Sequence, residues 1–80
     1  MILKRVYFDE NKHTVTHWTP YVTSAARFYD ENWQADVVEM YFKGDHPAER
    51  VNLHEGEGVY LCNDEGKTIE VLSRLQETIR

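Results

Sequence analysis

The chain has 80 residues, of which 41% are hydrophobic and 29% are charged, and its formal net charge at pH 7 is −5. This length predicts a single domain over residues 1–80, with a core so small that assembly into a homo-oligomer is a common remedy. The charge is uneven, because residues 30–65 carry ten acidic and two basic side chains. Nucleic-acid binding needs a basic footprint, so no direct contact with nucleic acid is expected.

The cysteine content and hydropathy predict a cytoplasmic protein. The single cysteine, Cys62, cannot form a disulfide within the chain, whereas small secreted domains usually contain several. Residues 1–8 lack the apolar stretch and cleavage site of a signal peptide. No apolar run approaches the roughly 20 residues that cross a bilayer, so no membrane partner is expected.

Three corners share one local pattern, in which strand-forming residues precede Asp-Glu and then Asn or Gly. The corners lie at residues 9–11, 30–32 and 64–66. Asp and Glu suit the right-handed positions of a type I turn, and Asn or Gly tolerates the left-handed position that follows. The sequence therefore predicts three hairpins closed by the same three-residue turn, most strongly at Gly66.

The flanks of these corners predict strands over residues 2–8, 13–18, 36–43, 49–54, 59–62 and 67–71, which are rich in β-branched and aromatic residues. Residues 44–47 and 55–58 are expected to form loops. Segment 37–42 is apolar on both faces, which favours a central strand over the alternative of an edge strand that pairs with another chain.

The predicted fold is mainly β, a small antiparallel roll, barrel or sandwich built from hairpins. A helix over about residues 20–33 on a meander sheet, giving an α+β fold, is the alternative. It rests on Thr19-Pro20, which resembles a helix start, and on apolar residues at helical spacing after it. Leu72, Leu75 and Ile79 also suit a short C-terminal helix.

Candidate chemistry is weak along the chain. His13 and His17 are four residues apart, which suits a metal on a helix, but on a strand this spacing separates them by about 13 Å. His46, His54 and Cys62 lack a recognised ligand spacing. Gly56-Glu57-Gly58 lacks the remaining residues of a phosphate loop. We therefore predict no catalytic residue, no metal ligand and no cofactor.

The aromatic and acidic residues predict a non-catalytic protein-binding module, an inhibitor or adaptor that docks on a partner with a basic surface. The predicted binding residues are Trp33, Glu39, Tyr41, Glu55, Glu57 and Tyr60. One alternative is an oligomeric protein that sequesters a small molecule between aromatic rings. A metal-dependent enzyme that uses the histidines is the third hypothesis.

Overall fold

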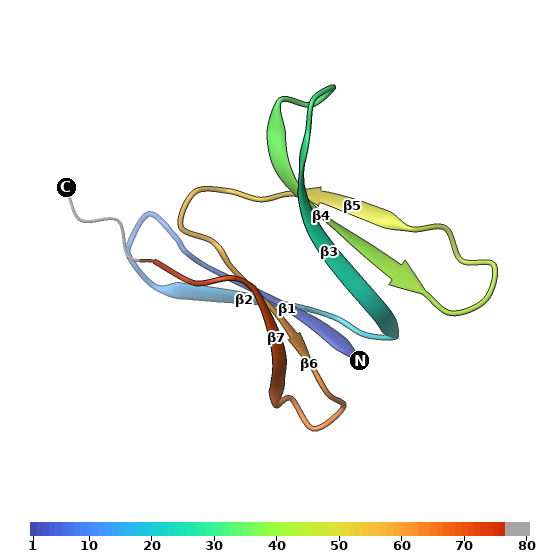
Figure 1. The fold of residues 1–80 in the computed structure, drawn as a ribbon. Coiled ribbons are helices and arrows are strands. Elements are labelled where there is room, and N and C mark those ends of the chain that lie inside the picture. Colours follow the sequence, from blue (N-terminus) through green and yellow to red (C-terminus); the bar gives the residue numbers. More distant parts are fainter. Residues whose placement is uncertain (77–80) are drawn as a thin grey trace.

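The computed structural model describes residues 1–76, and within them the chain forms seven β-strands and no helix. The strands are β1 (Ile2–Phe8), β2 (Thr14–Thr19), β3 (Val22–Asp30), β4 (Ala35–Phe42), β5 (Glu49–Asn52), β6 (Gly58–Cys62) and β7 (Thr68–Ser73). They make a four-stranded sheet of order β2-β1-β6-β7 and a three-stranded sheet of order β3-β4-β5 (Figure 1). All pairings are antiparallel, which confirms the mainly β fold.

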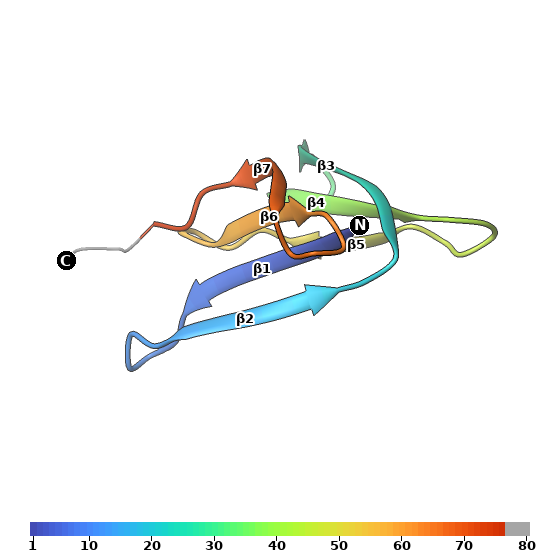
Figure 2. The same cartoon turned by 90° about the horizontal axis from the view of Figure 1, so that it is seen from below.

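A small core lies between the two sheets. Its buried residues are Leu3, Val59 and Leu61 from the four-stranded sheet and Val22, Val38 and Met40 from the three-stranded sheet. The chain passes from one sheet to the other at Pro20–Tyr21 and again in the link after β5, which arcs across in Figure 1. The molecule measures 44 × 35 × 18 Å, and Figure 2 shows this flattened form from a second side.

Strand β4 is the central strand of the three-stranded sheet, as its apolar pattern predicts. Val38 and Met40 point toward the core and are 0% and 3% exposed. Val37 belongs to the opposite face by alternation, yet it is also 0% exposed. The outer face of this sheet must therefore carry side chains that cover Val37.

The helix alternative over residues 20–33 is wrong, because these residues form β3 and part of the turn that follows it. Cross-strand pairing with β4 prevails over the helical spacing of the apolar residues. Leu72 lies in β7, and residues 74–76 are not helical. The rest of the predicted C-terminal helix, including Ile79, lies outside the described residues. No helix among residues 1–76 has the length and apolar character to cross a membrane.

The three predicted corners all reverse the chain, but they are not one turn used three times. In the first, Lys12 rather than Asn11 adopts the left-handed conformation, with φ of 63°. The first corner matches the third when Asp9 is aligned with Asn63, since each side-chain oxygen accepts from the backbone N–H groups two and four residues later.

The second corner is a longer loop. Residues 31–34 all lie in the turn, and the left-handed residue is Gln34, with φ of 52°, instead of Asn32. Asp30 pairs with Ala35 at the mouth of the hairpin. The extra residues place Trp33 at the end of the sheet, where its ring reaches back over the strands.

Candidate functional site

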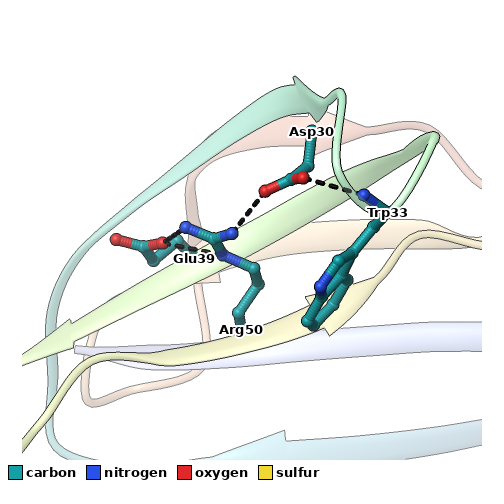
Figure 3. Close-up of polar contacts among 4 residues, drawn as sticks. All are labelled: Asp30, Trp33, Glu39 and Arg50. Carbon is teal, nitrogen blue, oxygen red and sulfur yellow. Dashed lines mark hydrogen bonds and ion pairs between the residues drawn. The ribbon is translucent and has the colours of Figure 1, made fainter.

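The outer face of the three-stranded sheet is organised around Arg50. Its guanidinium binds Glu39 from the neighbouring strand, with Nε 2.9 Å from Oε2, and also binds Asp30 at the end of β3 (Figure 3). It lies 5.1 Å from the ring centre of Phe28 and 5.7 Å from that of Trp33. We call the set Phe28, Asp30, Trp33, Glu39, Tyr41 and Arg50 the Arg50 face.

The register of the sheet positions these side chains. Arg50 lies directly opposite Glu39, and Phe28 lies directly opposite Val37. Because directly opposed residues in antiparallel strands share a face, Arg50 crosses the position of Val37 to reach Asp30. The long apolar stem of arginine suits this role, since it covers apolar surface while its head remains charged. This arrangement accounts for the burial of Val37.

The backbone of Trp33 is fixed by a hydrogen bond within the β3–β4 turn. Its backbone N–H donates to Oδ1 of Asp30 at 2.9 Å, while the other oxygen of that carboxylate binds Arg50. The Trp33 residue is nevertheless 51% exposed. One side of the indole therefore contacts the arginine, and the rest is free for another molecule.

The electrostatics of the Arg50 face keep Glu39 ionised. The hydrogen bond from Arg50, followed by the interaction with the neighbouring Tyr41 hydroxyl, lowers the pKa of Glu39 below its usual value of 4.5. The interaction with Glu39 in turn raises the pKa of Tyr41 above its usual value of 10.0, because the nearby carboxylate disfavours a negative charge on the phenol oxygen. The Glu39 hydrogen bond also raises the pKa of Arg50. The face is thus a fixed array of two carboxylates, one guanidinium and exposed rings.

The predicted binding residues divide among three places. Trp33, Glu39 and Tyr41 lie together on the Arg50 face, whereas the other three do not join them. Glu55 is exposed in the link between β5 and β6. Tyr60 is half-buried in β6, and its hydroxyl accepts from the backbone N–H of Leu75 at 2.9 Å. It therefore holds the segment after β7 against the sheet.

Glu57 is 1% exposed and does not present its carboxylate to a docking partner. Its two oxygens accept from Nε and Nη2 of Arg5 at 3.0 and 3.3 Å. Its backbone carbonyl accepts from the Ser73 hydroxyl at 2.8 Å. These contacts connect three segments, namely β1, β7 and the link that precedes β6. Glu57 therefore has a structural role.

The histidines do not form a metal site within residues 1–76, although His17 and His54 line the same groove. His17 stacks on Tyr7 with ring centres 5.7 Å apart, and His46 packs on Phe42. Cys62 is fully buried in β6. Within residues 1–76 no group of three or more His, Cys, Asp or Glu side chains is placed to hold a metal ion.

Sequence reasoning missed Arg50 and Phe28, and it assigned Asp30 only to a turn. Arg50 is one of two basic residues in an acidic region, so charge counting draws attention to its neighbours instead. Its pairing with Glu39 depends on the register between β4 and β5, which no local pattern in the chain reveals.

No protein-family model matches this chain, and comparisons with curated proteins and with solved structures also find no match.

Proposed function

We propose that the protein is a non-catalytic binding module that docks through the Arg50 face on a protein partner with a basic surface. The observation that supports this most is Trp33, an aromatic side chain that is half-exposed and yet fixed by Asp30 and Arg50. Tryptophan, tyrosine and arginine are the residues that most often dominate the energy of protein interfaces.

Preorganisation adds to this argument. Association is weakened by the entropy lost when side chains are immobilised at an interface. On the Arg50 face, the carboxylates of Asp30 and Glu39 are already held by Arg50 on neighbouring strands. Tyr41, which is 38% exposed, extends the aromatic surface beside Glu39. A partner would meet a surface that is already in its bound geometry.

The charge supports a basic partner. Residues 30–65 have eight more acidic than basic side chains, and the exposed Glu31 lies two residues before Trp33 in the same turn. Complementary charge accelerates association and disfavours acidic competitors, and its effect weakens as salt screens it. The proposed complex should therefore be sensitive to ionic strength.

The experiment compares three versions of the full chain as bait in extracts of the source cells: wild type, Trp33→Ala and Tyr21→Ala. Tyr21 is 84% exposed and does not belong to the Arg50 face, so it is a matched aromatic control. The expected partner is retained by wild type and Tyr21→Ala and is lost with Trp33→Ala. With the purified partner, Trp33→Ala should weaken binding by about thirtyfold.

Salt titration of the purified complex completes the test. Affinity should fall between about 0.05 and 0.5 M salt, because the Debye length shortens several-fold over that range. Circular dichroism of Trp33→Ala checks that its fold is intact. A partner that binds wild type and Trp33→Ala equally, or with the same affinity at both salt concentrations, would overturn the proposal.

A further inference from the structure

A groove of about 1090 Å³ lies away from the Arg50 face and shares no lining residue with it. One wall is the end of the β1–β2 hairpin, and the other is the link that precedes β6. The groove lies beside the Arg5–Glu57 ion pair, and both of these residues line it. Its volume is close to the upper end of the range for sites that hold small organic ligands.

Aromatic rings form part of the wall. Tyr7 and His17 are stacked at an interplanar angle of 21°, and the Tyr7 hydroxyl lies 3.3 Å from Nε2 of His17. Phe8 also lines the groove. The stack and the contact between Tyr7 and His17 hold these two rings in place before any ligand arrives.

The charges around the groove are predominantly negative. Four carboxylates and two cationic side chains line it. Arg5 and Glu57 neutralise each other, and Asp9 accepts from the backbone of its own turn. Glu10 and Glu55 are exposed and form no salt bridge within the part of the chain that the structure describes. They are the carboxylates available to a ligand.

Aromatic rings elsewhere in the molecule already hold cationic side chains, and on the Arg50 face carboxylates take part as well. Lys4 lies over the rings of Trp18 and Tyr60, and Arg50 lies over two rings of its own face. Within residues 1–76 no cationic side chain lies over Tyr7 or Phe8, although both line the groove together with its carboxylates. Rings beside carboxylates attract organic cations, because the negative ring face adds to the attraction of the anion.

We propose that this groove binds an organic cation, a guanidinium or alkylammonium group, between Tyr7 and the carboxylates of Glu10 and Glu55. The site is separate from the proposed docking surface and does not depend on it. An anionic ligand would meet an excess of carboxylates, and a purely apolar ligand would leave them without partners.

The test uses N-acetyl-arginine amide as the probe and N-acetyl-citrulline amide as its neutral counterpart of nearly the same shape. Binding is followed by backbone amide shifts of the full chain in an NMR titration. The expected result is saturable shifts at Gly56 and His17 with the arginine probe and none with the citrulline probe. Equal shifts with both probes, or no saturation by about 20 mM, would overturn the proposal, since a cation site requires charge selectivity.

Variants locate the site. Glu10→Gln with Glu55→Gln should weaken binding of the arginine probe by about fivefold to thirtyfold. Glu65→Gln with Glu70→Gln removes the same charge from exposed positions that do not line the groove, so binding should change little. An equal loss in both pairs would show a general charge effect and overturn the proposal. Tyr7→Leu should weaken binding of the arginine probe by a similar factor, provided that the amide spectrum of the variant is that of a folded chain.

Two further probes distinguish the source of the cation. Spermidine represents a free polyamine, and the peptide Gly-Arg-Gly represents a basic side chain of a protein. Tighter binding of one identifies that source, and similar binding of both supports a site that recognises the cation alone. If neither shifts the groove amides, the proposal fails even though the docking function of the Arg50 face can still hold.

Discussion

Two arginine–carboxylate contacts occupy contrasting regions of this molecule. Arg5, in strand β1 of the four-stranded sheet, binds Glu57 in the link that precedes β6. The Glu57 side chain is 1% exposed and that of Arg5 is 22% exposed. Arg50 meets Glu39 and Asp30 on an outer face, with the Arg50 side chain 34% exposed. In the first contact one guanidinium binds one carboxylate, and in the second one guanidinium binds two carboxylates.

The difference in burial separates their roles. When one member of a buried ion pair is removed, the charge that remains is uncompensated in a poorly solvated place, and the fold is strongly destabilised. Exposed ion pairs contribute little to stability, because water and salt replace the lost contact. The Arg50 contacts are intermediate, because the Asp30 and Glu39 side chains are 10% and 17% exposed. The Arg5–Glu57 pair is therefore expected to contribute more to folding stability than the contacts of the Arg50 face.

The largest effect is expected at Glu57. Glu57→Gln leaves the Arg5 guanidinium without a counter-charge, and the free energy of unfolding should fall by about 3–5 kcal/mol in urea denaturation. The double variant Arg5→Met with Glu57→Met removes both charges and should be more stable than Glu57→Gln alone. If Glu57→Gln lowers the free energy of unfolding by less than about 1 kcal/mol, the Arg5–Glu57 pair contributes no more than an exposed ion pair, and the proposed difference between the two regions is wrong.

An intermediate effect is expected at Asp30, whose side chain is 10% exposed. Asp30→Ala removes both the turn bond to Trp33 and the contact with Arg50, and should reduce the free energy of unfolding by about 1–2 kcal/mol. Asp30→Asn keeps an oxygen for the Trp33 N–H and should lose less. Thermal denaturation of both variants provides the measurement, and equal losses would show that the turn bond contributes nothing.

The smallest effect concerns acid stability. Because Arg50 lowers the pKa of Glu39 in the folded chain, the ionised carboxylate stabilises the fold above its usual pKa of 4.5. This contribution is lost as the pH falls from 4.5 through the lowered folded value. The stability difference between wild type and Glu39→Gln should therefore shrink below pH 4.5 in urea denaturation series.

Tyr41→Phe provides the control for acid stability, since it removes the hydroxyl that is the second cause of the lowered Glu39 pKa and leaves Arg50 in place. It should retain most of the acid dependence of the wild type. A stability difference between wild type and Glu39→Gln that stays constant from pH 7 to pH 3 would contradict the role assigned to Arg50.

Much of the fold could be predicted from local patterns, because strands and turns depend on nearby residues. The first strand was predicted over residues 2–8, as observed, and Gly66 does occupy the left-handed position of its turn. Lys12 and Gln34 escaped prediction because a non-glycine residue at positive φ is uncommon and is imposed by the surrounding hairpin.

Less of the candidate site could be predicted, because it depends on contacts between distant strands. Trp33, Glu39 and Tyr41 were selected by residue type, but Arg50, which organises them, becomes visible only when β4 and β5 are in register. Glu57 was selected as an exposed acid, whereas its partner Arg5 lies 52 residues away along the chain. Residue type alone does not separate a structural carboxylate from a surface one.

Strand β3 has a further consequence for the behaviour of concentrated solutions. It is nine residues long and lies at the end of the order β3-β4-β5, so one row of its backbone groups faces away from the sheet. A bulge between Val22 and Ser24 breaks the regularity of this row. Arg27 lies opposite Val38 and stays partly exposed, and its guanidinium donates to the Leu72 carbonyl of the other sheet at 3.3 Å. The bulge and the charged Arg27 are therefore the features that disfavour pairing of this edge with another chain and the growth of fibres, since neither a helix nor another strand covers the edge within the described residues.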